Sequence, residues 1–144
     1  MDKKVLFVRI TFIAGAVADA LFVPPLMFPK LAGMVIGIND FAPDATALYL
    51  MNVGAALMAG WTGILLWAAA NPIERRGIIP ITLFPLLSGL IAAGIPFYMA
   101  GGISLGRMAP LWCVSVILMI AQGIGYFFMK NAKDQASPTP IGQT

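Results

Sequence analysis

The sequence predicts an all-α integral membrane protein in which a bundle of four helices crosses the bilayer, with both termini in the cytoplasm. Of the 144 residues, 60% are hydrophobic and only 10% are charged, whereas soluble domains carry about a quarter charged residues. Four apolar segments each reach the roughly 20 residues that a helix needs to span the hydrocarbon core. The basic residues gather at alternate ends of these segments.

Inside lipid, every backbone N–H and C=O must be paired within the protein, so each apolar segment is expected to be helical. The expected helices cover about 5–28, 46–70, 78–100 and 109–129. Prolines close the first helix and interrupt the third, where a proline leaves a carbonyl without its partner and tends to kink the helix. The four helices form one transmembrane domain over residues 1–130.

The longest connection, residues 29–45, joins the first two helices. Its apolar run at 34–38 is expected to lie at the membrane surface, and Asp44 is expected to cap the second helix. After the fourth helix, residues 131–144 are polar and contain prolines, so we expect a disordered cytoplasmic tail.

The basic residues indicate the topology. Seven fall on one side of the predicted crossings, and two, Lys30 and Arg107, fall on the other. Cytoplasmic loops carry the excess of Lys and Arg, so we expect a plasma (inner) membrane location with both termini inside. The seven are Lys3, Lys4, Arg9, Arg75, Arg76, Lys130 and Lys133.

A cleaved signal peptide is the alternative for residues 1–20, because a basic start precedes an apolar stretch with small residues at Ala18 and Ala20. The apolar run continues through residues 21–23 and beyond, which is longer than the apolar part of a signal peptide. This continuation favours an uncleaved membrane helix.

The available side chains narrow the chemistry. The chain has no histidine and a single cysteine, Cys113. This composition excludes an intrachain disulfide, histidine-ligated haem, the usual zinc sites and a Ser–His or Cys–His catalytic pair. We therefore expect no catalytic residue, no metal and no cofactor, and an enzyme is the least favoured class. Nucleic acid is not an expected partner, because the basic residues lie at the ends of apolar runs rather than in a patch.

Asp19 is the first candidate ligand-binding residue. It is the acidic residue well inside a predicted span, where an ionised carboxylate costs on the order of 3 kcal/mol. A proton-binding group or a contact for a cationic ligand are the functional interpretations. The alternative is a protonated carboxyl group that is hydrogen-bonded between helices.

Asn52, Trp61 and Gln122 complete the candidate ligand-binding set. Asn52 shares a helical stripe with small residues, so we expect it to face inward near the depth of Asp19, or simply to join two helices. Trp61 lies near mid-span and either flanks a ligand or packs. Gln122 either lines a cavity that continues from Asp19 or bonds a helix backbone.

The layout of the chain adds a resemblance to a known group. Arg9 opens the first helix, the semi-apolar first loop ends near 41–43, and the second helix has a glycine-rich run at 52–60. Over roughly residues 9–128, the chain resembles the DoxX-like group of small four-helix membrane proteins. The resemblance implies a link to quinone-dependent oxidoreductase complexes. Related four-helix folds bind sterol-like ligands with intramembrane acidic residues, for which Asp19 is the candidate.

Three functions remain open from the sequence. The first is binding or carrying an apolar or amphipathic small molecule, such as a quinone or a lipid-like ligand, in a mostly apolar pocket between the helices. The second is an accessory subunit that packs against a larger membrane complex through faces of small residues. The third is a proton-coupled transporter or channel formed by a homo-oligomer. The expected partners are therefore the lipid bilayer, such a ligand, and a membrane complex or further copies of the chain.

Overall fold

The computed structural model describes residues 3–136, with side chains described over 3–128, and this part of the protein consists of helices and their connections, without strands. Four helices there are long and apolar enough to cross a membrane, which confirms the predicted all-α, multi-pass class. These spans are Lys3–Met27, Ala45–Ala70, Ile78–Met99 and Leu105–Phe128.

The spans lie close to the ranges expected from the sequence, and the structure adds a short helix in the first connection. The elements in chain order are α1 (Lys3–Met27), α2 (Pro29–Ile36), α3 (Ala45–Ala70), α4 (Ile78–Ile81), the π-helical turn η1 (Thr82–Leu87), α5 (Ser88–Met99) and α6 (Leu105–Ala136). The last helix continues to Ala136, into the segment expected to be a tail, and the remainder of that segment, 137–144, lies outside the described residues.

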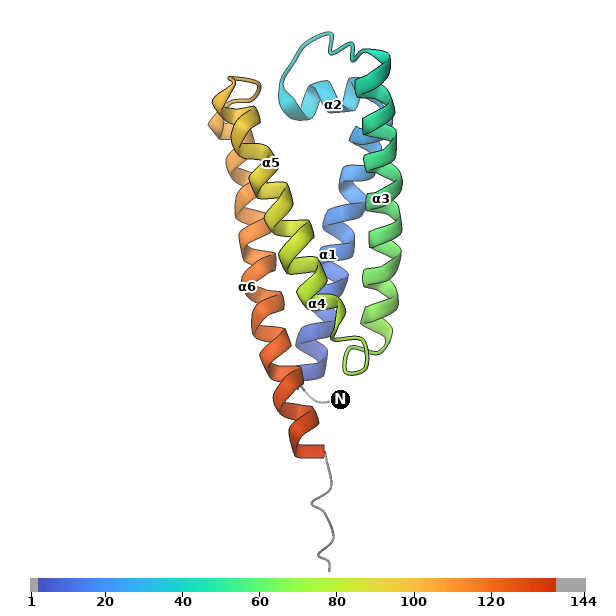
Figure 1. Ribbon diagram of the computed structural model, residues 1–144, viewed down its shortest axis with the longest axis vertical. Helices are drawn as coiled ribbons and strands as arrows, with labels where there is room; N and C mark the ends of the chain where they lie inside the picture. Colours follow the sequence, from blue (N-terminus) through green and yellow to red (C-terminus); the bar gives the residue numbers. More distant parts are fainter. Residues whose placement is uncertain (1–2, 137–144) are drawn as a thin grey trace, which may run out of the picture.

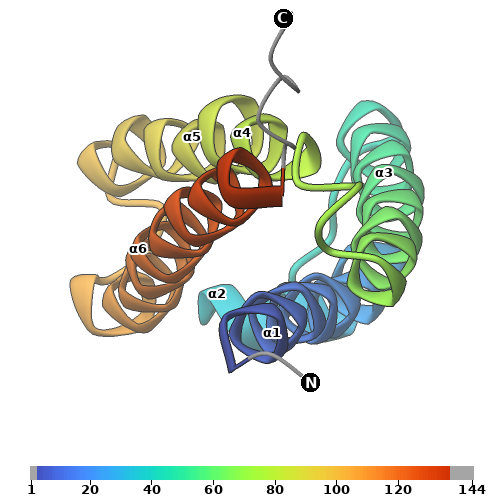
Figure 2. The same ribbon diagram turned by 90° about the horizontal axis from the view of Figure 1, so that it is seen from below.

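The helices are arranged as an open arc. Viewed along the helices, α3, α1, α6 and α5 follow one another, and α3 and α5 form its two ends (Figure 2). The most extensive contact is between α1 and α3, and α6 packs against both α1 and α5. Figure 1 shows the two pairs, α1–α3 and α5–α6, diverging toward the end that carries α2. We call this the α2 end and the opposite one the N-terminal end.

The hydrophobic core lies toward the N-terminal end. A cluster of buried side chains there joins α1, α3 and α4, whereas α5 buries none of its residues. Close packing at one end and its absence along α5 explain why the helix pairs separate toward the α2 end. The cluster consists of Val8, Phe12, Ala16, Leu65, Ala68, Ala69 and Ile79.

Two arginines bond the last carbonyl groups of α3 at the N-terminal end. Arg9 donates from Nε to the carbonyl oxygen of Ala69 at 3.0 Å and from Nη2 to that of Ala70 at 3.3 Å. Arg75 donates from Nη1 to the carbonyl oxygen of Trp67, and its guanidinium lies 3.9 Å from the centre of the Trp67 ring. These contacts satisfy carbonyls that a helix terminus leaves without an intrahelical partner.

Backbone turns and caps shape the α2 end. Gly37 ends α2 with φ of 82°, a left-handed conformation that favours glycine, and its N–H donates to the carbonyl of Gly33. Asp44 accepts a hydrogen bond from the Ala47 N–H at 2.7 Å, which confirms the predicted cap at the start of α3. Across the molecule, Arg107 Nη1 donates to the Met34 carbonyl oxygen at 2.8 Å and ties the start of α6 to α2.

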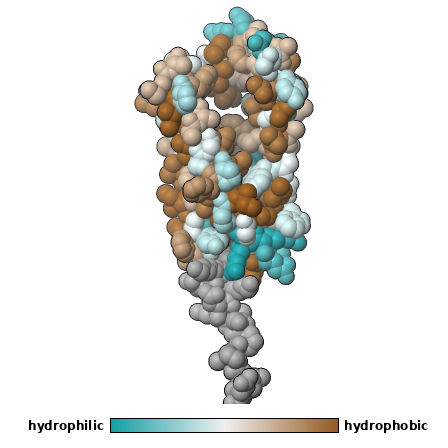
Figure 3. All heavy atoms as spheres, in the orientation of Figure 1, coloured by the Kyte–Doolittle hydropathy of each residue, from teal (hydrophilic) through white to brown (hydrophobic). Residues whose placement is uncertain are grey.

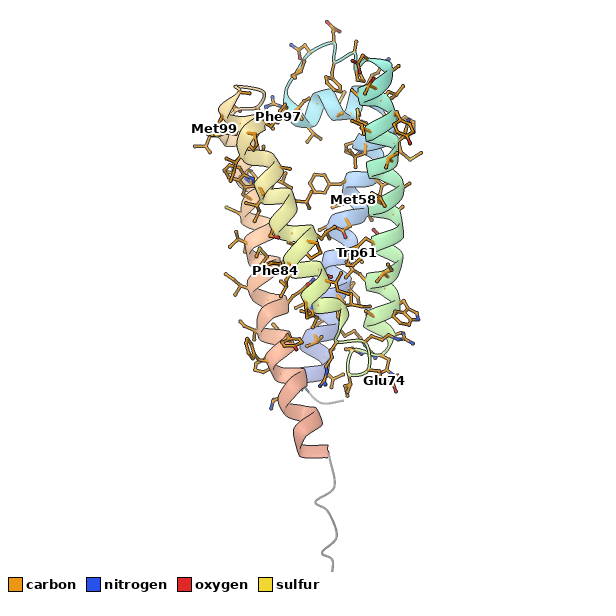
Figure 4. The ribbon with its side chains drawn as sticks, in the orientation of Figure 1. Met58, Trp61, Glu74, Phe84, Phe97 and Met99 are labelled. Atoms are coloured by element: carbon orange, nitrogen blue, oxygen red, sulfur yellow. The ribbon has the colours of Figure 1, made fainter. Side chains whose placement is uncertain are left out.

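The third crossing contains the backbone irregularity that its prolines predict. Pro85 lies within η1, where its missing N–H cannot continue a regular helical ladder and the backbone takes a π-helical turn. Phe84, in this turn, is 86% exposed and points away from the other helices (Figure 4). Pro24 and Pro25 lie in the last turn of the first helix, as expected, and α1 ends two residues after them at Met27.

Candidate functional site

Asp19 is the last member of the buried stripe of α1. The buried residues of this helix recur every three or four positions and include Phe12, Gly15 and Ala16, so one face of α1 is turned into the protein. Asp19 lies on this face with only 7% of its surface exposed, and its Oδ2 atom has no hydrogen-bond partner among the described residues. A buried carboxyl oxygen without a partner loses its hydration without compensation.

Trp61 of α3 lies at the same level as Asp19. A Cβ atom added at Gly15 would lie 3.3 Å from Leu65 Cδ1, which sets the register between α1 and α3. Asp19 is one turn from Gly15 and Trp61 is one turn from Leu65, both toward the α2 end, because α1 and α3 run in opposite directions. Trp61 lies at mid-height on α3 (Figure 4), and its buried Nε1 atom has no partner within the described part of the chain.

Gln122 approaches from α6 one layer nearer the N-terminal end. The side chain is 1% exposed, and its Nε2 atom would lie 3.3 Å from a Cβ atom added at Gly15. Neither Oε1 nor Nε2 has a hydrogen-bond partner among the residues with described side chains. The site therefore contains a carboxyl group, an indole N–H donor and a carboxamide that offers both donors and acceptor capacity.

These three side chains lie where the two helix pairs begin to separate. A Cβ atom added at Gly125 would lie 3.0 Å from Val8, and Gly15 faces Gln122 at a similarly short distance, so α6 is close to α1 up to this level. Beyond it the pairs diverge (Figure 1). The space-filling view is hollowed just beneath α2, between α5 and the α1–α3 pair (Figure 3). The unpaired polar groups thus lie near the level at which the two pairs separate.

Asn52 does not belong to this group. The structure places it on an exposed face of α3, so the expectation that it faces inward and reaches Asp19 is wrong. Its small neighbours are also exposed, and no described atom lies within 4 Å of a Cβ atom added at Gly60 or Gly63. The stripe has helical spacing, but α3 packs on α1 through the opposite side, where Gly54 faces Leu26 and Leu65 faces Gly15.

Other buried polar groups show which residues are not candidates. The hydroxyl groups of Thr82 and Ser115 donate to carbonyl oxygens one turn earlier, at 3.0 Å and 2.9 Å, and so are satisfied within their own helices. Trp112 differs from these two residues, because its buried Nε1 has no partner among the described residues and the sequence analysis did not single it out; a Cβ atom added at Gly94 on the adjacent helix would lie 2.9 Å from this nitrogen.

The groups of the candidate site can make hydrogen bonds to a bound molecule. Within the described residues, no cluster of three metal-ligating His, Cys, Asp or Glu side chains occurs. The carboxyl, indole and carboxamide groups include no activated nucleophile with an adjacent base, which covalent catalysis requires. They can instead accept and donate hydrogen bonds to one polar group that enters an otherwise apolar space. Comparison of the chain with protein-family models, with curated proteins and with solved structures finds no match.

Proposed function

We propose that this protein binds or carries an amphipathic small molecule, quinone-like or lipid-like, in the opening between the α1–α3 and α5–α6 pairs. The single observation that carries the proposal is the set of unpaired buried groups near the level where the two pairs separate. Asp19 Oδ2, Trp61 Nε1 and both amide atoms of Gln122 lack partners among the described residues. Buried polar groups are nearly always hydrogen-bonded, so a polar group of a ligand is the missing partner.

The surroundings of these groups agree with an apolar ligand body. The outer surface of the helices is largely hydrophobic (Figure 3), so a molecule dissolved in the bilayer can reach the opening between α3 and α5 without crossing water. Ligand sites of this kind are mostly apolar, with a few polar groups that fix orientation. The resemblance to the DoxX-like group supports a quinone as one ligand class.

We further propose that the helices form one bundle in the plasma (inner) membrane, with both termini cytoplasmic and the α2 end outside. The bias of seven basic residues against two supports this orientation. A cysteine placed at Asn39 or Lys3 in a Cys113→Ala background tests it. A membrane-impermeant maleimide added to intact cells is expected to label only the cysteine at position 39. Labelling of the cysteine at position 3 would show the opposite orientation.

The ligand proposal is tested by native mass spectrometry of the full chain released gently from its own membrane. Wild type is expected to retain a small molecule that Asp19→Asn and Gln122→Leu lose or retain at much lower occupancy. Asn52→Leu is the matched control, because it removes a polar side chain from an exposed face of α3. A wild type without bound ligand, or equal occupancy in all four proteins, would contradict the proposal.

A second candidate function is supported by the exposed stripe on α3. Small residues let membrane helices approach closely, and Ala56, Gly60 and Gly63 are exposed there beside Asn52. This face suits packing against another subunit, as an accessory subunit would require. In the same spectra, a second polypeptide present with wild type and absent from Gly60→Leu would favour this function. Spectra in which neither wild type nor Gly60→Leu retains a second polypeptide would contradict the accessory-subunit function.

A further inference from the structure

A cavity lies at the α2 end, apart from the unpaired buried groups of Asp19, Trp61 and Gln122. It has a volume of about 630 Å³ and is formed by α2, the loop that follows it and the start of α6. Gly33 and Gly37 contribute its backbone wall, and Phe41 contributes an apolar side. This volume falls in the range of small-molecule sites.

The charges that line this cavity are unusual for their side of the molecule. Lys30 and Arg107 are the two basic residues that the chain places at the α2 end, and both line this one cavity although they are far apart in sequence. Asp40 is the single acidic residue in the lining. The cavity therefore carries a net positive charge on the side where the positive-inside bias leaves few cations.

Arg107 is held in position and retains guanidinium N–H donors that its contact with Met34 does not use. Its Nη1 atom donates to the Met34 carbonyl oxygen at 2.8 Å, and Gly37 leaves room for it, because a Cβ atom there would lie 2.5 Å from Arg107 Cζ. A guanidinium has five N–H donors, and the Met34 carbonyl uses one. A fixed guanidinium with free donors is well suited to phosphate or carboxylate.

Capping of α2 by itself does not account for this arrangement. A cation near the last carbonyls of a helix is favourable, which explains the contact of Arg107 with Met34. It does not explain Lys30, which is exposed, lies in the first turn of α2 and bonds no described residue. A cation at the start of a helix is electrostatically unfavourable, and an anion bound in this cavity would offset that cost.

We propose that this cavity binds the acidic head group of an anionic amphiphile, a phosphate or carboxylate, between Lys30 and Arg107. This inference rests on the proposed function and narrows its ligand to the lipid-like class. The apolar chain would extend into the hollow beneath α2 (Figure 3), and the unpaired atoms of Asp19, Trp61 and Gln122 would remain for a second polar group of the ligand. Asp19 precedes the end of α1 by eight residues, about 12 Å along the helix, which keeps its carboxyl group away from the acidic head group.

Equilibrium binding to the full chain in phosphatidylcholine nanodiscs tests the proposal. The probes are dodecyl phosphate, its neutral counterpart monolauroylglycerol, and inorganic phosphate. Wild type is expected to bind dodecyl phosphate more tightly than monolauroylglycerol. Lys30→Gln and Arg107→Gln are each expected to weaken dodecyl phosphate binding about tenfold and to leave monolauroylglycerol unchanged. Lys3→Gln, the same charge change at the other end of α1, is expected to have no effect.

The outcomes separate this proposal from the one on which it rests. Unchanged dodecyl phosphate binding in Lys30→Gln would overturn the head-group site, and this variant removes no hydrogen bond seen in the structure. Inorganic phosphate binding as tightly as dodecyl phosphate would overturn the lipid source and assign the cavity to a free anion. If neither amphiphile binds wild type, the lipid-like form of the proposed function fails, whereas equal binding of both amphiphiles to every variant leaves that function standing and overturns the acidic head group alone.

Discussion

Gln122 of α6 packs directly against Gly15 of α1. A Cβ atom added at Gly15 would lie 3.3 Å from Gln122 Nε2, tighter than ordinary van der Waals contact. The absence of a side chain on α1 thus lets a buried carboxamide enter the space between the helices. This contact also sets the level at which α6 leaves α1 and the opening beneath α2 begins.

The first prediction concerns this close approach. Gly15→Val would place methyl groups against both Gln122 and Leu65 and should lower the free energy of unfolding by about 1–3 kcal/mol, as overpacking does. The measurement is reversible unfolding of the full chain in mixed detergent micelles, followed by circular dichroism. Gly123→Val is the matched control on α6, because no described atom lies within 4 Å of a Cβ atom there. Equal losses for the two variants would show that the α1–α6 contact is not tight.

The second prediction concerns Gly37. Alanine there would keep a left-handed backbone, at a cost of about 1–2 kcal/mol, and would also displace Arg107 from the Met34 carbonyl. Hydrogen exchange is therefore expected to accelerate at the Gly37 and Ile38 amides, which both donate to the Gly33 carbonyl.

Gly101→Ala provides the control for this effect. Gly101 has φ of 74°, and no described atom lies within 4 Å of an added Cβ, so its substitution carries the backbone cost without a clash. It should leave exchange in α2 unchanged. Faster exchange in α2 for both variants would mean that Arg107 does not hold α2 in place.

The third prediction concerns Arg9 and the end of α3. Arg9→Leu removes the donors to the Ala69 and Ala70 carbonyl oxygens. Because Arg9 is only partly buried, the expected loss is about 1–2 kcal/mol, at the lower end of the range for charged hydrogen bonds. Arg9→Lys should recover only part of this lost stability, because an ammonium group lacks the forked geometry with which the guanidinium reaches two carbonyl oxygens.

The same unfolding measurement, combined with hydrogen exchange, checks this prediction. Protection is expected to fall in the last turn of α3 and the loop 71–77 and to stay constant near Asp44, at the far end of that helix. A uniform loss of protection along α3 would show that Arg9 stabilises the molecule as a whole rather than this helix terminus.

The candidate site shows which features of the structure can be predicted from sequence patterns. The sequence singles out Asp19, Trp61 and Gln122 because polar or amphipathic side chains are rare inside apolar spans, and all three carry buried unpaired atoms. The same argument singles out Asn52, which faces outward. Helical periodicity tells which residues share a face, but the identity of the neighbouring helix decides whether that face is buried.

The cavity at the α2 end could not be derived from spacing. Lys30 and Arg107 appeared in the sequence as two isolated exceptions to the charge bias. Both line one cavity because α2 ends in a left-handed turn at Gly37 and because Arg107 donates a hydrogen bond to the Met34 carbonyl oxygen. Both events depend on contacts between segments far apart in the chain.

By itself, the sequence determined the helical class, the number of helices able to cross a membrane, their approximate limits and the cap at Asp44. These properties follow from local physics: apolar length, the need to pair backbone groups in lipid, and side-chain bonds to nearby N–H groups. Only the tertiary structure decided which faces meet, where the pairs diverge and which charges converge. Those outcomes depend on side-chain fit between helices, as at Gly15 and Gln122, and no single helix encodes that fit alone.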